Sequence, residues 1–356
     1  MTRELTTKRA PLLLLMAACA IMLAGCDEEK APAPQVAEPA PPSGEACLQD
    51  AIDKLAEDKI DEASVAITNA IALLPDSAEA LMVEGQVAYR KKDYAKAKKN
   101  FDAVASEKSL PATLRGAALA ARAVVEFKQN AFDAAHLTLF RAFRLNRNDP
   151  VVCYHLGRLA RNTYHFNEVA RERFAVAAHF SDPNDPRTKK LRDEIRAIDA
   201  EMAQEAASRP GATTRDAGAA AKLIAEAEGL LKKNRVTAAA KKYEAALAAD
   251  PFSYPAARET ARLLSKTDKT PTCVDKALRA YRTAIDLRPA VQENYLAAAQ
   301  LAYANRRWAT TASILERAIA HDPENTKSLD LYIAALKNAG RTQQSQAWGA
   351  YRQELR

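Results

Sequence analysis

AAKLIAEAEGLLKKNRVTAAAKKYEAALAADP, residues Ala220–Pro251, is the stretch that decides the fold. Its first half places apolar residues three and four apart, on one face of a helix, and this pattern stops at Asn234 and Arg235. A second amphipathic stretch runs from about residue 236 to 248. It ends at Asp250 and Pro251, because proline lacks the donor that a continuing helix needs. Two helices joined by a tight turn are therefore predicted.

The large and small residues of this stretch occupy fixed positions in a longer unit. With Pro251 at position 32, Leu223 lies at position 4, Ala239 at 20, Tyr243 at 24 and Ala246 at 27. This arrangement resembles the 34-residue tetratricopeptide repeat (TPR). The resemblance implies that small residues at positions 20 and 27 let neighbouring helices approach closely, while large residues at positions 4 and 24 fill the gap between them.

Copies of the same pattern occur in register along most of the chain after its first forty-odd residues, about eight units in all. Their marker residues are Ala63, Ile67, Ala70 and Pro75; Leu81, Gly85, Ala97 and Phe101; Phe132, Ala135 and Leu139; Gly157, Ala170 and Phe174; Ala277, Tyr281 and Pro289; Leu315, Ala318 and Pro323; and Leu329 and Gly340. A series in register is a much stronger signal than one match. The last unit departs from the pattern, with Ser345 at position 20.

The predicted fold class is all-α. Glycine is scarce, with 10 residues in 356, and strand-like alternation is absent, which favours a helical solenoid over a globular α/β domain. The resemblance implies a right-handed superhelix in which each unit contacts mainly its neighbours. We expect a signal peptide at 1–25, a tether at 26–44, a repeat block with a capping helix at 45–207, a linker at 208–218 with a break near Pro210, and a second block with a terminal capping helix at 219–356.

The first residues have the features of an export signal. Arg3, Lys8 and Arg9 precede an apolar run, Leu12–Leu23, that is too short to span a bilayer as a mature helix. The sequence from Leu23 to Cys26, LAGC, resembles a bacterial lipobox, which implies cleavage before Cys26 and acylation of that cysteine. An ordinary signal peptide with an incidental cysteine, or an uncleaved anchor, is the alternative. Several acyl chains would give stable anchoring.

The resemblance to lipoproteins also predicts a location. Asp27 after the lipidated cysteine resembles the signal that retains lipoproteins in the inner membrane of enteric bacteria, although other lineages do not follow that rule. We expect the repeats in the periplasm of a Gram-negative-type bacterium, with the anchor in the inner or the outer membrane. Residues 31–44 are rich in proline and alanine, and as an extended tether they would reach roughly 40 Å at about 3.1 Å per residue.

The charge of the chain does not favour nucleic acid as a partner. Basic residues exceed acidic ones by seven, and removal of residues 1–25, with three basic and one acidic residue, lowers the excess to five. This is a mild imbalance, without a concentrated basic stripe or interleaved aromatic residues. It leaves room for an acidic partner or anionic lipid.

Cysteines and histidines give no metal-binding pattern. Besides Cys19 and Cys26, the chain has Cys47, Cys153 and Cys273, an odd number without a CxxC motif. The first two of these three fall near position 4 of their units, which predicts buried core residues, although a disulfide stays open. Four of the five histidines lie in two neighbouring repeats, but no two are three or four residues apart. We predict surface or groove positions for His136, His155, His165 and His179.

No motif indicates catalysis. The sequence lacks GxSxG, HExxH, a phosphate-binding glycine loop and a paired-carboxylate site. We therefore predict a protein that is not an enzyme, with no cofactor, no metal and no small-molecule substrate. An enzyme built from scattered residues is the weakest of the functional hypotheses.

Binding to other proteins is the predicted function, because stacked helix pairs form a concave face lined by the first helix of each unit. The resemblance places the groove at positions 2, 5, 9, 12 and 13. The candidate binding residues are Tyr89, Arg90, Phe127, Lys128, Tyr154, Arg158, Arg161, Arg258, Arg262 and Tyr303. Their aromatic and basic groups suit an extended or helical peptide with apolar anchors and some negative charge. The carboxylate clamp of chaperone-binding TPR proteins is not recognisable, since position 6 holds Val83, Ala121, His155 and Ala225.

The sequence thus predicts a lipid-anchored periplasmic scaffold for protein partners of an envelope assembly. Similar lipoproteins serve pilus assembly, secretion, outer-membrane assembly and cell-wall machinery. The alternative is a polysaccharide-binding or export-associated helical-repeat lipoprotein, whose glycan contacts should depend on groove aromatics such as Tyr89 and Tyr154. The last helix, with Trp348 and Tyr351, is expected to shield the end of the solenoid, with Trp348 as a second candidate for a docking edge.

Overall fold

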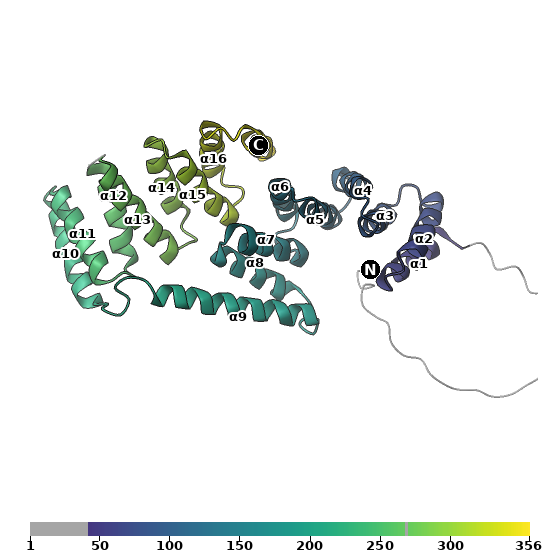
Figure 1. Ribbon diagram of the computed structural model, residues 1–356, viewed down its shortest axis with the longest axis horizontal. Coiled ribbons are helices and arrows are strands. Elements are labelled where there is room, and N and C mark those ends of the chain that lie inside the picture. Colours follow the sequence, from purple (N-terminus) through teal and green to yellow (C-terminus); the bar gives the residue numbers. More distant parts are fainter. Residues whose placement is uncertain (1–41, 268–269) are drawn as a thin grey trace, which may run out of the picture. The chain divides into compact units, whose positions relative to one another are not determined.

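The computed structural model describes residues 42–267 and 270–356, and Ser43–Arg356 form one compact unit (Figure 1). Within this part of the chain every regular element is helical and no strand occurs. The predicted signal peptide, Cys26 and nearly all of the tether lie outside the described residues. The last tether position, Gly44, instead begins the first helix, because the Ser43 hydroxyl accepts a hydrogen bond from the Ala46 N–H and caps it.

The helices form eight consecutive hairpins, with one unpaired long helix after the fourth. The first four hairpins are α1 (Gly44–Ala56) with α2 (Ile60–Leu73), α3 (Ala78–Arg90) with α4 (Tyr94–Ser106), α5 (Ala112–Lys128) with α6 (Phe132–Leu145), and α7 (Pro150–Leu159) with α8 (Asn167–Phe180). The long helix is α9 (Pro186–Ala207). The last four are α10 (Ala217–Lys232) with α11 (Val236–Ala249), α12 (Tyr254–Thr267) with α13 (Pro271–Leu287), α14 (Gln292–Ala304) with α15 (Trp308–His321), and α16 (Thr326–Asn338) with α17 (Thr342–Gln353).

The turns inside the hairpins share one backbone conformation. Each turn whose residues are all described has one residue with positive φ directly before the second helix's cap, as in Lys92 (φ 64°) and Asn234 (φ 55°). This left-handed residue reverses the chain within two or three positions. In the last hairpin Gly340 (φ 76°) fills the position, where glycine avoids the steric cost of a side chain.

The core of a hairpin shows why the spacing of the sequence pattern matters. Gly85 of α3 packs directly against Phe101 of α4, and a Cβ atom on that glycine would lie 2.5 Å from Phe101 Cε1. Gly157 and Phe174 repeat this contact at 2.5 Å in the α7–α8 hairpin. Positions 8 and 24 of the repeat therefore form one contact, in which the missing side chain makes room for the ring. The predicted all-α, TPR-type solenoid is confirmed.

Helix α7 continues into a π-helical turn, Ala160–Tyr164, before the α7–α8 hairpin turn. The wider turn carries Arg161 and places the Tyr164 hydroxyl 3.0 Å from His136 Nδ1. Single π turns inside helices often occur near functional sites. This one shifts the end of the helix relative to the ideal repeat.

Helix α9, in the place of the expected capping helix, packs on α8, with Leu191 and Ile198 buried. The chain then passes through residues 208–216, where Gly211 has φ 81° and Arg215 pairs with Asp250 at 2.8 Å. The division into two blocks with a break near Pro210 stays a prediction.

Contacts between distant hairpins were not expected. One hydrophobic core cluster extends from residues of α5–α9 into residues of α14–α17, and α17 contacts α6 directly. Each unit still contacts mainly its neighbours, as expected, and these distant contacts come in addition. The physical reason is that α6 and α8 have apolar and charged groups on a second face, which the later helices cover.

Among the described helices, none combines the length and the apolar character that crossing a membrane requires.

Candidate functional site

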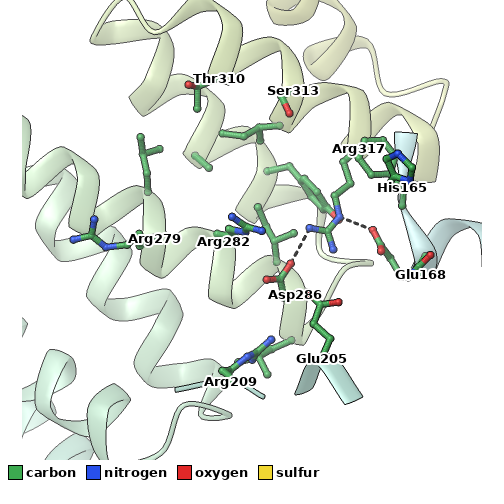
Figure 2. A pocket seen from close by; sticks show the side chains of 18 of the residues that line it. His165, Glu168, Glu205, Arg209, Arg279, Arg282, Asp286, Thr310, Ser313 and Arg317 are labelled. Carbon is green, nitrogen blue, oxygen red and sulfur yellow. Dashed lines mark hydrogen bonds and ion pairs between the residues drawn. The ribbon is translucent and has the colours of Figure 1, made fainter. Parts of the chain in front are cut away.

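One pocket lies between helices that are far apart in the sequence. Its volume is about 940 Å³, and its walls come from α8, α9, α13, α14 and α15 together with the loop after α9. In Figure 2, Arg209 and Glu205 lie at one end of the pocket, and Thr310 and Ser313 lie at the other. Three of these helices, α8, α13 and α15, are second helices of their hairpins.

Arg317 of α15 ties the wall of the pocket together. It forms an ion pair and a hydrogen bond with Glu168 of α8, and a second ion pair with Asp286 of α13 at 2.8 Å (Figure 2). Burial alone would raise the pKa of Glu168, but the neighbouring His321 ring and the charge and hydrogen bond of Arg317 lower it to about 2. The pKa of Arg317 is raised, because its carboxylate neighbours outweigh the effect of burial.

The end of α15 is held by two further charged groups. The ring of His321 lies 3.6 Å from Glu168 and 3.4 Å from Glu172. Burial would lower the pKa of His321, but these two carboxylates outweigh it and raise the pKa. Arg173 is buried over the ring of Phe143, 4.4 Å from its centroid, and donates to the carbonyl of His321 at 2.9 Å. These contacts satisfy carbonyl groups that a helix end leaves without partners.

Of the other four arginines that line the pocket, three have no ion pair within the described residues. Arg307 is paired with Asp275, but Arg279 and Arg282 of α13 have no ion pair or hydrogen bond in that part of the chain. Arg209 lies over the ring of Phe252 at 5.3 Å and has a buried Nη1 atom with no hydrogen-bond partner there. Three arginines therefore line the pocket without an ion pair in the described residues, and one of them, Arg279, is near enough to Asp275 for its charge to help lower the pKa of that carboxyl group.

Apolar groups form the rest of the wall. Met202 of α9, Leu278 and Ile285 of α13, and Ile314 of α15 line the pocket. Tyr295 of α14 is fully buried at the same wall, and its hydroxyl has no hydrogen-bond partner among the described residues. A pocket of this size with apolar walls and a few convergent polar groups is typical of a ligand-binding site.

The residues predicted for the groove all lie on first helices or directly after one, and none lines this pocket. Several are engaged within the chain. Arg90 pairs with Asp58 at 3.1 Å, and Arg161 pairs with Glu201 of α9 at 2.7 Å. Arg262 is bound to Glu259 on its own helix at 2.6 Å.

The aromatic members of that set form local contacts. Tyr89 packs against Tyr94, Phe127 against Phe132 and His155, and Tyr303 against Trp308. Tyr154 lies beneath the exposed Arg158 at 5.8 Å, and together with His155 it lines a second pocket of about 470 Å³ between α7, α8 and α9. Lys128 and Arg258 are exposed. Binding by these residues stays a prediction.

Sequence reasoning missed the large pocket because it examined only the first helix of each unit. A signal was present nevertheless. Arg279 and Arg282 are three residues apart, which places both residues on one face of α13, a second helix of its hairpin.

Two expectations from the sequence concern the possible metal ligands and the cysteines of the described ranges. No group of three or more His, Cys, Asp or Glu side chains within residues 42–267 and 270–356 has a metal-binding arrangement. Cys47 and Cys153 are buried, as expected from their positions in the repeat. Burial raises the pKa of the Cys153 thiol to about 11, so that it stays protonated at neutral pH.

His136 corrects one expectation. It was predicted on the surface or in the groove, but it is buried, with its ring 4.2 Å from that of Phe140 and 5.7 Å from that of Trp348. The reason is that α17 covers this face of α6. Burial lowers the pKa of His136 to about 3.

A pH dependence follows from this burial. The folded pKa of His136 lies below the unfolded value of 6.5, so its stabilising effect is complete above pH 6.5 and is lost as the pH falls toward 3. We expect the free energy of unfolding to fall by up to about 1.4 kcal/mol per pH unit below 6.5 through this group. Urea titrations at pH 7 and pH 5 should show a smaller fall in His136→Gln, which can keep a hydrogen bond to Tyr164. His179→Gln, at an exposed site, should behave like the wild type. Equal falls in all three proteins would contradict the prediction.

Comparisons with known proteins identify similar folds only. Neither protein-family models nor curated protein sequences match the chain. Among solved structures, a TPR protein from Parabacteroides merdae has a TM-score of 0.33 at 10% identity, covering 82% of this chain and 98% of that one. The TPR2AB domain of yeast Sti1 in a pHSP90 complex gives 0.29 at 15%, with 82% and 98% covered. The pilF protein of Pseudomonas aeruginosa gives 0.26 at 14%, with 81% and 95% covered.

Proposed function

We propose that this chain is a lipid-anchored adaptor of the bacterial cell envelope that holds a protein partner for an assembly such as pilus, secretion, outer-membrane or cell-wall machinery. The observation that carries the proposal is the pocket of about 940 Å³, whose walls are joined by the Glu168–Arg317–Asp286 network. Such a network keeps the wall in one arrangement before a partner arrives. Preorganisation of this kind lowers the entropic cost of binding.

The location is supported by sequence features alone. The lipobox-like residues Leu23–Cys26, the short apolar run before them and the proline-rich tether after them are what an anchored periplasmic domain requires. The residue after the lipidated cysteine does not decide between the inner and the outer membrane in every bacterial lineage, so the proposal leaves both open. The tether would let the repeats reach a partner at some distance from the lipid surface.

Two surfaces of the chain suit a partner. The predicted groove of the first helices offers Tyr89, Phe127 and Tyr154, and the pocket offers arginines and apolar side chains. Neither surface has the metal site or the paired carboxylates on which most hydrolytic chemistry depends. Recruitment of a protein is therefore the function that the geometry supports best.

Photo-crosslinking in cells tests this proposal. A photoreactive amino acid is placed at Ser313 in the pocket, at Tyr89 or Phe127 in the groove, and at the exposed Val65 as a control, with wild-type Cys26 retained. We expect one envelope protein to be captured from the pocket or the groove, but not from Val65. Cys26→Ser should move the chain from the membrane fraction to the soluble fraction and reduce the capture.

The outcomes separate the alternatives. Adducts with glycan alone, from Tyr89 above all, would favour the polysaccharide-binding hypothesis over the adaptor. If no position captures a protein, the adaptor proposal fails. If Cys26→Ser leaves the chain in the membrane fraction, the lipid anchor is wrong while the adaptor role can still stand on the captured partner.

A further inference from the structure

We infer that the pocket between α8, α9, α13, α14 and α15 binds an extended acidic segment of a protein partner, whose carboxylates pair with Arg209, Arg279 and Arg282. This inference rests on the proposed function, since it names the chemistry of the partner. The pocket contains none of the residues predicted for the groove, so the inferred site is a different one from that expected from the sequence.

The charge of the pocket is the first step. The arginines and acidic residues of the wall nearly balance in number, but Arg307 and Arg317 already use Asp275, Glu168 and Asp286. The other acidic lining residue, Glu205, has no ion pair in the described part of the chain. Among the described residues, three arginines without an ion pair therefore line the pocket together with one such carboxylate, and a ligand that brings negative charge completes the balance.

Unpartnered polar atoms are the second step. Arg209 Nη1 and the Tyr295 hydroxyl are buried at the pocket and lack hydrogen-bond partners in the described residues. A buried polar group without a partner costs free energy, commonly about 1–3 kcal/mol. A carboxylate oxygen can accept from both groups, because a phenol and a guanidinium are donors. A neutral apolar ligand would leave both unsatisfied.

Spacing indicates a peptide in extended conformation. Arg279 and Arg282 are neighbours on one helix face, with Cβ atoms about 5–6 Å apart. In an extended chain, side chains two positions apart lie about 6–7 Å from each other on one side. The side chains of Arg279 and Arg282 point apart in Figure 2, so carboxylates on one side of an extended segment would have to be more than one alternate position apart to pair with both. Apolar side chains between them can contact Leu278, Ile285 or Met202.

The size of the pocket fits several side chains rather than one small ion. A volume of about 940 Å³ lies near the upper end of the range for ligand pockets. Its apolar wall would stay unused by phosphate alone. Anionic lipid headgroups could also meet the arginines, and the experiment below has an arm for them.

The test uses the full chain with Cys26→Ser, so that no lipid is attached, and a fluorescein-labelled peptide, GELESELEG. Binding is measured by fluorescence anisotropy, and GQLQSQLQG is the neutral probe. We expect the acidic probe to bind more tightly at low salt and to weaken as salt screens the arginines. Reversing the charge of both residues (Arg279→Glu and Arg282→Glu) should weaken the affinity for the acidic probe by about a hundredfold, on the order of tenfold for each charge.

Arg258→Glu is the matched control. Arg258, Arg279 and Arg282 are all exposed, so these substitutions should leave the thermal midpoint close to the wild type, but only Arg258 belongs to the predicted groove. The inference is overturned if the acidic probe does not bind, if both probes bind equally, or if Arg258→Glu weakens binding and the pocket variant does not. It is also overturned if the pocket variant loses only binding to phosphatidylglycerol vesicles.

Failure of this inference can be told apart from failure of the proposed function. If photo-crosslinking captures a partner from Tyr89 or Phe127 while the pocket variant keeps full capture, the adaptor stands and the acidic-segment site falls. If capture from Ser313 yields the chain's own N-terminal residues, which include Asp27, Glu28 and Glu29, the pocket has an internal occupant and the inference is again overturned.

Discussion

Replacing Arg317 with methionine is expected to lower the free energy of unfolding by about 3 kcal/mol. The substitution keeps an apolar stem but leaves Glu168 and Asp286 as largely buried carboxylates without their shared cation. Removal of one partner from a buried ion pair is costly because the other charge stays desolvated. Urea denaturation at pH 7, with the slope checked for constancy, measures the loss.

The same measurement has a control and a pH test. Arg196 pairs with Asp193 on the surface of α9, and Arg196→Met should cost less than about 0.5 kcal/mol. Because the folded pKa of Glu168 is lowered to about 2, its contribution is present above the unfolded value of 4.5 and is lost as the pH falls toward 2. The difference between wild type and Arg317→Met should therefore shrink below pH 4.5. Equal losses for the two arginines would show that the network does not hold α8 to α15.

Trp348→Ala is expected to lower the free energy of unfolding by about 3–5 kcal/mol, as much as Arg317→Met or more. The indole is only 3% exposed and lies against Tyr332 of α16 and against His136 and Phe140 of α6. Truncation leaves a cavity at the place where α17 joins two distant hairpins. Thermal or urea denaturation measures the loss, and hydrogen exchange should show faster exchange of the amides of α6 around Phe140.

Trp308 offers a matched control for that substitution. It is partly exposed and packs edge-on against Tyr303 within its own hairpin, at 4.8 Å between ring centroids. Trp308→Ala should cost clearly less than Trp348→Ala and should leave exchange in α6 unchanged. If the two tryptophans prove equivalent, α17 is not held on α6. The docking-edge hypothesis for Trp348 would then return.

The repeat pattern could be predicted because its causes are local. Gly85 and Phe101 are 16 residues apart and meet inside one hairpin, so a fixed spacing in the sequence corresponds to a fixed contact. The same holds for Gly157 with Phe174. Neighbouring units then stack in a way that depends only on the repeat itself. The period of the sequence pattern therefore predicts the fold of each hairpin.

Contacts between distant hairpins have no such period. Arg141 of α6 binds Glu354 after α17 at 2.7 Å, and 213 positions separate the two residues. Before the fold is known, Arg141 is one of many surface arginines, and Trp348 is an aromatic residue near a chain end. The pocket arginines were hidden for the same reason. Arg279 and Arg282 become part of a pocket only because the fold places α8 and α9 at the same pocket.

The bond between Arg141 and Glu354 also affects how the chain reaches its folded state. A ribosome makes the N-terminal hairpins first, and each of them can form from contacts within a few dozen residues. The docking of α17 on α6 must wait until Glu354 has been made, because this residue is part of the contact. The entropy of closing so long a loop grows only slowly with its length, but folding rates fall as contacts become less local. The apolar face of α6 around Phe140 and His136 would therefore stay open to solvent, or to a chaperone, until α17 has been made.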